Sequence, residues 1–169
     1  APPRWISVRA LPSSGSVELR CLAGAANPRA VVVGGTALAD DTDWWTSFGK
    51  LGGFRLVDVI GVHPYTWGWG APETQGLLSV LQSVRSLADR FGGRGKPIFD
   101  TESAFPSAWE GTGSTLWTQA DFDARKIVLE RSLGVLSGQF LVEGGWQDWG
   151  VIDSVRGDLP ELREVVEIG

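Results

Sequence analysis

Hydrophobic positions follow two patterns that alternate along the chain. Short continuous apolar runs, rich in β-branched residues, are typical of strands that are buried on both faces. These runs cover residues 30–33, 57–62, 98–102 and 139–142. Between them, apolar residues recur every three or four positions, as Leu77, Leu81 and Val84 do, which predicts helices with one buried side. The order strand, helix, repeated about four times, predicts an α/β fold in which helices cover parallel strands.

Local signals set the expected bounds of the helices. Acidic residues open a helix over 40–51, and Pro72 and Glu73 open the next one, which ends at Gly92. Thr118 with Asp121 resembles a capping box, and the helix that follows is expected to run to about residue 138. Its buried side is expected to consist of Ile127, Val128, Leu133 and Leu136. Shorter helices are expected over residues 17–26 and 160–168.

The length of 169 residues allows one domain with a substantial core. Residues 17–169 are expected to form it, and residues 1–16 are expected to be irregular apart from a possible short strand at 5–8. The net charge of −5 argues against nucleic acid as a partner, and no apolar run approaches the roughly 20 residues of a membrane-spanning helix. The chain contains no Met, so we expect a processed product or a piece of a longer protein. The compartment in which it works stays open.

Cys21 is the one cysteine, so no intrachain disulfide is expected. A single His and a single Cys far apart give no metal-ligand spacing, and the Gly pairs lack the pattern of a phosphate loop. We therefore expect neither a metal nor a cofactor. No Gly-x-Ser-x-Gly elbow supports a serine nucleophile.

The apolar run from Ile98 ends in the acidic sequence Asp100-Thr101-Glu102. Because side chains alternate along a strand, Asp100 and Glu102 are expected to share one face. Two acids on one face at the tip of a buried strand are costly unless something pairs with them or uses them. This arrangement favours an enzyme that works with carboxylates, and it makes Glu102 the first candidate for a catalytic residue.

Further candidates follow the other predicted strands. Function in folds of this kind lies at the carboxyl ends of the strands. A phenol near a carboxylate can hydrogen-bond its charged form, and Trp, of which the chain has nine, either packs in a core or stacks on flat faces such as sugar rings. The expected ligand-binding residues are His63, Tyr65, Trp67, Asp100, Trp146 and Asp148.

Three of these stretches resemble a known group of enzymes. Residues 57–65, 96–102 and 146–153 resemble the sixth, seventh and eighth strands of the large clan of retaining glycoside hydrolases, and residues 27–35 resemble the fifth. The nearest likeness is to the β-xylosidase and α-iduronidase family and its cellulase-like relatives. The resemblance implies half of a TIM-type (β/α)8 barrel, strands five to eight. It implies that Glu102 is the nucleophile, that His63 and Tyr65 line the sugar subsite, and that Trp146 supports the ring.

The chain departs from this family at one essential point. The family's acid/base is a Glu that follows an Asn at the end of strand four, and this chain contains no Asn-Glu pair. A half barrel would leave sheet edges unpaired and apolar surface exposed, which invites association. Three explanations are open: the first half lies outside this chain, another chain supplies it, or two copies close on each other as a homodimer.

Three functions are consistent with the sequence. The first is a piece of a retaining glycoside hydrolase that acts on a β-linked glycan. The second is a noncatalytic, carbohydrate-binding or structural half-barrel, in which Glu102 only hydrogen-bonds sugar hydroxyls. The third is an unrelated open α/β protein whose acids at the strand ends bind another small ligand.

Overall fold

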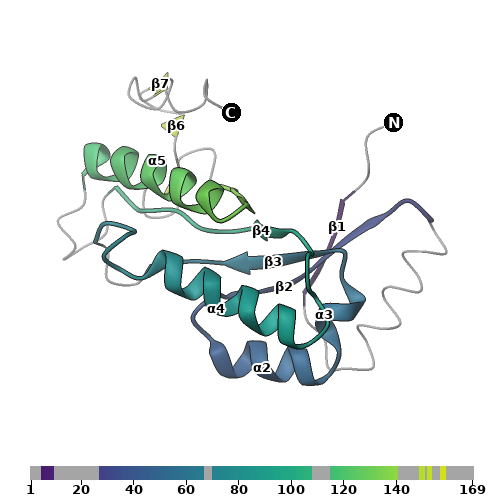
Figure 1. Ribbon diagram of the computed structural model, residues 1–169. Coiled ribbons are helices and arrows are strands. Elements are labelled where there is room, and N and C mark those ends of the chain that lie inside the picture. Colours follow the sequence, from purple (N-terminus) through teal and green to yellow (C-terminus); the bar gives the residue numbers. More distant parts are fainter. Residues whose placement is uncertain are drawn as a thin grey trace.

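Five parallel strands form the central sheet, and their order in the sheet follows their order in the chain (Figure 1). The computed structural model describes residues 5–9, 27–66, 70–107, 115–140, 149–150, 152–153 and 157–158. The strands of the sheet are β1 (Trp5–Arg9), β2 (Val31–Leu38), β3 (Val59–His63), β4 (Ile98–Asp100) and β5 (Val135–Leu136). Strands β6 (Ile152–Asp153) and β7 (Gly157–Asp158) form a separate antiparallel pair. The parallel sheet with helices between its strands confirms the predicted α/β class.

The sheet has five strands, one more than the four that the apolar runs predicted. β1 pairs in parallel with β2, with Trp5 opposite Val31, so the short strand considered for residues 5–8 is part of the sheet. The N-terminal segment therefore contributes an element of the fold although it was expected to be largely irregular. The predicted domain boundary at residue 16 and the helix over 17–26 lie outside the described residues.

In the described residues, four helices lie between the strands of the sheet. They are α2 (Thr42–Lys50), α3 (Gly53–Leu56), α4 (Leu77–Arg90) and α5 (Leu116–Ser132). In Figure 1, α2 and α4 lie side by side, and α5 lies beyond β4. None of the helices in the described ranges has both the length and the apolar character needed to cross a membrane. The helix expected over 160–168 falls outside these ranges.

The apolar core lies between the sheet and helices α2 to α4. Leu77, Leu81, Val84 and Ala88, the predicted stripe of α4, are all buried. They belong to the same cluster as Trp45 of α2 and Ile60 of β3. Full burial of one such side chain contributes roughly 1.5–3 kcal/mol. This cluster fixes β3 and β4 as neighbours.

The structure corrects the predicted end of the first strand. Gly34 and Gly35 were expected to close the run that begins at residue 30, but β2 continues through them to Leu38. The register shifts between Gly35 and Ala37, where Thr36 has a left-handed φ of 47°. Small residues accommodate such a bulge, so they do not necessarily end a strand.

The last strand of the sheet lies earlier in the chain than the predicted run at residues 139–142. Gly134 has a left-handed φ of 69° just after α5, a conformation that ends a helix and that glycine adopts without strain. The strand then forms at Val135–Leu136, and Gln139 and Phe140, at the start of the predicted run, are not in a strand. Residues 141 and 142 lie outside the described residues.

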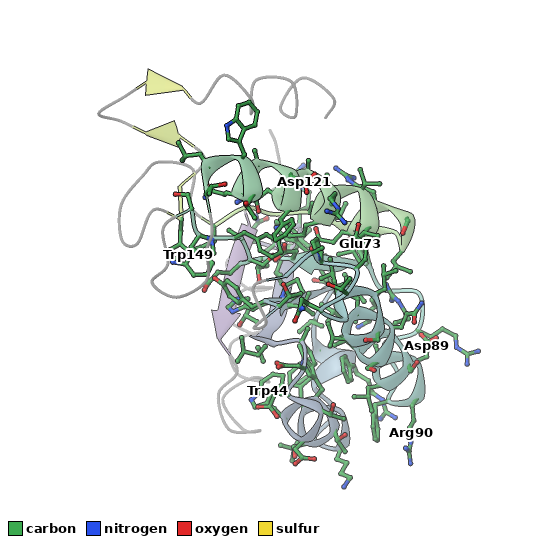
Figure 2. All side chains as sticks on the ribbon, turned by 90° about the vertical axis from the view of Figure 1, so that its left-hand side faces the viewer. Trp44, Glu73, Asp89, Arg90, Asp121 and Trp149 are labelled. Atoms are coloured by element: carbon green, nitrogen blue, oxygen red, sulfur yellow. The ribbon has the colours of Figure 1, made fainter. Side chains whose placement is uncertain are left out.

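The predicted buried side of α5 is correct only in part. Leu133 packs against the core and Ile127 is half-buried. Val128 is 68% exposed and Leu136 is 40% exposed, while polar and charged side chains of α5 are buried. These buried residues are Gln119, Asp123, Lys126 and Glu130. On the outer side, Arg125 bonds both Asp121 and Glu73, which links α5 to the segment that precedes α4; Figure 2 shows Asp121 and Glu73 on this side of the molecule.

Candidate active site

The ends of β3 and β4 bring three candidate residues together. Val62 pairs with Asp100 across the two strands, so His63, at the end of β3, lies next to the segment that follows β4. Tyr65 lies two residues beyond His63, and Glu102 lies two residues beyond Asp100. Because the strands are parallel, these side chains meet at one edge of the sheet, as predicted for the carboxyl ends of strands.

The carboxylate of Glu102 is bonded by one partner and flanked by the other. The hydroxyl of Tyr65 donates a hydrogen bond of 3.0 Å to Oε1, and Nε2 of His63 lies 3.9 Å from Oε2. The side chain of Glu102 is 39% exposed and that of His63 is 17% exposed. The carboxylate is thus oriented by the bond to Oε1 while a large part of the side chain still faces solvent.

The surroundings keep Tyr65 in its protonated form. Burial raises the pKa of the phenol far above its usual value, and the hydrogen bond to Glu102 raises it further. The negative charges of Glu102 and Asp100 add to this increase in the pKa. The phenol therefore remains a hydrogen-bond donor to Glu102 across the physiological pH range.

Trp149, which precedes β6 in the chain, also lies beside this group. This buried indole packs edge-on against Tyr65, with ring centroids 5.7 Å apart. Gln119 of α5 donates from Nε2 to the carbonyl oxygens of Phe105, at 2.8 Å, and Gly150, at 3.4 Å. In Figure 2, Trp149 lies on the opposite side of the molecule from Asp89 and Arg90 at the end of α4.

Neither Trp149 nor Gln119 was among the predicted site residues. Trp149 lies within the stretch 146–153 that carried the resemblance. Its position close to the candidates Trp146 and Asp148 was the one signal in the sequence that it belongs to the site. Gln119 gave no signal, because a polar residue early in a helix is ordinarily solvated.

Asp100 does not join this group, contrary to the prediction. The chain leaves strand geometry after Asp100, so alternation no longer places Asp100 and Glu102 on one face. Asp100 is fully buried, and its Oδ2 accepts a hydrogen bond of 2.9 Å from Nζ of Lys126 in α5. A buried and paired carboxylate offers no surface to a sugar, so the expected role of Asp100 in substrate binding is not supported.

The other predicted contacts are not described by the structure. Trp67, Trp146 and Asp148 lie outside the described residues, so their placement at the site stays a prediction. Within the described ranges, no three His, Cys, Asp or Glu side chains gather in a way that could hold a metal ion.

An oriented, partly exposed carboxylate can act in two ways. It can attack an electrophilic carbon as a nucleophile, or it can accept hydrogen bonds from hydroxyl groups of a ligand. In the described part of the chain, the hydrogen bonds and ion pairs of the Glu102 side chain go to Tyr65 and His63. A retaining glycosidase also needs a second carboxylic acid about 5 Å away.

The solved structures that this chain resembles in fold include glycoside hydrolases. A glycoside hydrolase family 17 β-1,3-glucanosyltransferase from Rhizomucor miehei matches with a TM-score of 0.61 and 14% identity, over 89% of this chain and 57% of that one. An active-site mutant of the Rhizomucor miehei enzyme in complex with laminaritriose matches with a TM-score of 0.64 and 13% identity, over 88% and 55%. A psychrophilic glycoside hydrolase family 10 endo-β-1,4-xylanase matches with a TM-score of 0.63 and 13% identity, over 90% and 50%.

These matches concern the fold and not the sequence. No family model matches the chain, and the search of curated proteins gives no significant match. The chain spans a little over half the length of the solved structures that it resembles. It therefore has the fold of a barrel-type glycoside hydrolase over about half of such a barrel.

Proposed function

We propose that this chain carries the nucleophile side of a retaining glycoside hydrolase that acts on a β-linked glycan. The observation that carries the proposal is the carboxylate of Glu102, which accepts a hydrogen bond from Tyr65 and lies beside His63, just beyond the ends of two adjacent parallel strands. The fold shared with glycoside hydrolases supports it. Trp67, Trp146 and Asp148 are retained as proposed contacts of the sugar.

In the proposed reaction, Glu102 attacks the anomeric carbon as the bond to the leaving oxygen breaks. A carboxylic acid protonates that oxygen and later removes a proton from the water that releases the sugar. Tyr65 stays protonated and holds Oε1, which leaves Oε2 beside His63 to form the new bond. Because the carboxylate is already oriented, less conformational entropy is lost on reaching the transition state, and the barrier is lower.

We further propose that the acid/base comes from outside this chain. In the family that the sequence resembles, this acid follows an Asn at the end of strand four. By the same resemblance β2 corresponds to strand five, so β1, which pairs with β2, would occupy the place of strand four. Between Trp5 and the end of β2, the sequence contains Glu18 as its one acidic residue, with no Asn before it. The missing carboxylate would be supplied by the other half of the barrel, either on a longer chain or on a partner.

The nucleophile can be tested without the acid. In 2,4-dinitrophenyl 2-deoxy-2-fluoro-β-glycosides, the dinitrophenolate leaves without protonation, and the fluorine slows the hydrolysis of the covalent glycosyl ester. We would incubate the chain with the glucoside and the xyloside, because the similar structures are named as a β-1,3-glucanosyltransferase and a β-1,4-xylanase. Intact mass and peptide mapping would locate the label.

The expected result is one added sugar on the peptide that contains Glu102 and none on the Glu102→Gln variant. Glu73→Gln is the matched control, because Glu73 lies on the surface in an ion pair with Arg125, away from the Tyr65 and His63 contacts. Absence of the label on a folded chain would overturn the proposal. Saturable binding of the sugar without any label would favour the noncatalytic carbohydrate-binding function.

A further inference from the structure

A buried ion pair lies directly behind Glu102. Lys126 of α5 and Asp100 of β4 are 1% and 0% exposed, and their charged atoms are 2.9 Å apart. Nζ of Lys126 also donates to Oγ of Ser103 at 2.9 Å, to the carbonyl oxygen of Ser103 at 3.0 Å and to that of Gly138 at 2.7 Å. The ammonium group thus bonds two segments of the chain outside its own helix, residues 100–103 and Gly138.

Asp100 connects this pair to Glu102. Its Oδ2 accepts from Lys126 and from the hydroxyl of Ser103, and its Oδ1 accepts a hydrogen bond of 3.1 Å from the backbone N–H of Glu102. The residues on both sides of Glu102 are therefore bonded: Thr101 donates from its N–H to the carbonyl of Val62, and Ser103 joins the ion pair. These bonds set the direction in which the Glu102 side chain leaves the backbone.

The segment after β5 is part of the same arrangement. A Cβ atom on Gly138 would lie 2.1 Å from the carbonyl oxygen of Asp100, so this close approach requires glycine. Lys126 bonds the carbonyl of the same residue. The ammonium therefore joins α5, the end of β4 and the segment that follows β5.

Asp100 is the carboxyl group that pairs directly with the ammonium of Lys126. Two further buried carboxyl groups, Asp123 and Glu130, also interact with the ammonium. Burial raises the pKa of Asp123 to about 7 and that of Glu130 to about 9, so Glu130 is neutral at pH 7 and Asp123 is partly so.

We propose that Lys126 is a positioning residue for Glu102, acting through Asp100 and the Glu102 amide. The proposal rests on the proposed function of Glu102 as a nucleophile. A buried ion pair adds little net stability compared with an apolar pair of similar shape. Its value here is directional, because it fixes the turn from which the nucleophile projects toward the sugar.

The first experiment measures the link itself and requires no sugar. Hydrogen exchange would be followed at the Glu102 amide and at the Ile60 amide, which donates to Pro97 between β3 and β4, as an internal reference. We expect Lys126→Met to raise the ratio of the two exchange rates by roughly tenfold or more. Leu81→Ala, a cavity in the core beneath α4, should leave that ratio unchanged although it lowers global stability.

The second experiment measures labelling of Glu102 by the fluoroglycoside. Displacing a nucleophile affects the rate of bond formation more than binding, so Lys126→Met should lower the maximal labelling rate by about tenfold to a hundredfold. The inhibitor concentration for half-maximal rate should change by less than about twofold, because the ion pair is buried and offers no exposed surface to the sugar. Ser103→Ala keeps both charges and should lower the maximal labelling rate by a smaller factor. If Lys126→Met does not fold, this variant tests the positioning role instead.

The two failures are separable. If the wild-type chain is not labelled at Glu102, the proposed function falls, and the exchange ratio still tells whether Lys126 orders the Glu102 backbone. If the wild type is labelled, but the exchange ratio and the labelling rate of the Lys126 and Ser103 variants match those of Leu81→Ala, the positioning role is overturned.

Discussion

Helices α4 and α5 occupy equivalent places after successive strands, but they bury opposite kinds of side chain. α4 buries Leu77, Leu81 and Val84, whereas α5 buries Asp123, Lys126 and Glu130. The apolar side of α4 does nothing beyond filling the space beside the sheet. The polar side of α5 lies behind the candidate nucleophile and forms directional bonds to the segment that carries it. In this fold, apolar periodicity identifies the buried side of a helix only where the helix has no more than a packing role.

The largest expected effect is the loss of the ion pair behind Glu102. Lys126→Met would leave the carboxylate of Asp100 buried without its ammonium, and breaking a buried pair on one side costs about 3–5 kcal/mol. Urea denaturation followed by tryptophan fluorescence measures this loss. The double variant Asp100→Asn/Lys126→Met removes both charges and should recover more than half of the loss. A double variant as unstable as the single one would contradict the importance of the charge.

A matched truncation on the other helix tests the apolar side of the comparison. Leu81→Ala in α4 removes a side chain that is 1% exposed, and we expect a loss of about 3 kcal/mol from lost burial and the remaining cavity. The loss should be the same at pH 5 and pH 9, because the surrounding cluster carries no titratable group. A pH-dependent loss would show that the two helices are energetically coupled.

The sequence predicted most of the fold because most of the fold depends on apolar burial. The stripe of α4 was predicted correctly, and so were the runs that became β2, β3 and β4, since each is a continuous apolar segment. Asp41, from the acidic start of the predicted helix, accepts from the N–H of Trp44 and caps α2. These elements are local, so their signals lie within a few residues of each other.

The site was predicted only in part, for reasons that are not local. Tyr65 and Glu102 each lie two positions beyond the end of a strand, and the parallel pairing of these strands brings the two residues together. The pairing of Asp100 with Lys126 joins residues 26 positions apart through the geometry of a helix on a sheet, which no short spacing encodes. Polar residues on α5 therefore indicated solvent exposure when they were in fact buried.

Titration of the buried acids of α5 should make stability fall as the pH rises. Burial raises the pKa of Glu130 from 4.5 to about 9, so between these values the folded state binds a proton that the unfolded state has released. The same argument applies to Asp123 between pH 3.8 and about 7. Glu130→Gln should remove the upper part of this decline and stabilise the fold by roughly 1 kcal/mol or more at pH 9.

Urea denaturation at pH 5, 7 and 9 measures the decline for both chains. The two should differ least at pH 5, because this pH lies just above the unfolded pKa of 4.5 and only a small part of the decline has taken place there. A wild-type chain whose stability rises between pH 7 and pH 9 would contradict a raised pKa of Glu130 and would show that Glu130 is buried as an anion.

The smallest effect concerns the start of the two helices. Gly76 precedes α4 and offers no side-chain cap, whereas the hydroxyl of Thr115 accepts from the N–H of Thr118 at 3.1 Å and caps α5. Thr115→Ala should therefore cost about 1 kcal/mol. The sequence pattern placed the cap at Thr118 instead, so Thr118→Ala is the matched control and should cost less than half as much. Equal losses in urea denaturation would mean that the bond between the two hydroxyls, 3.0 Å apart, stabilises the helix start more than the bond to the backbone.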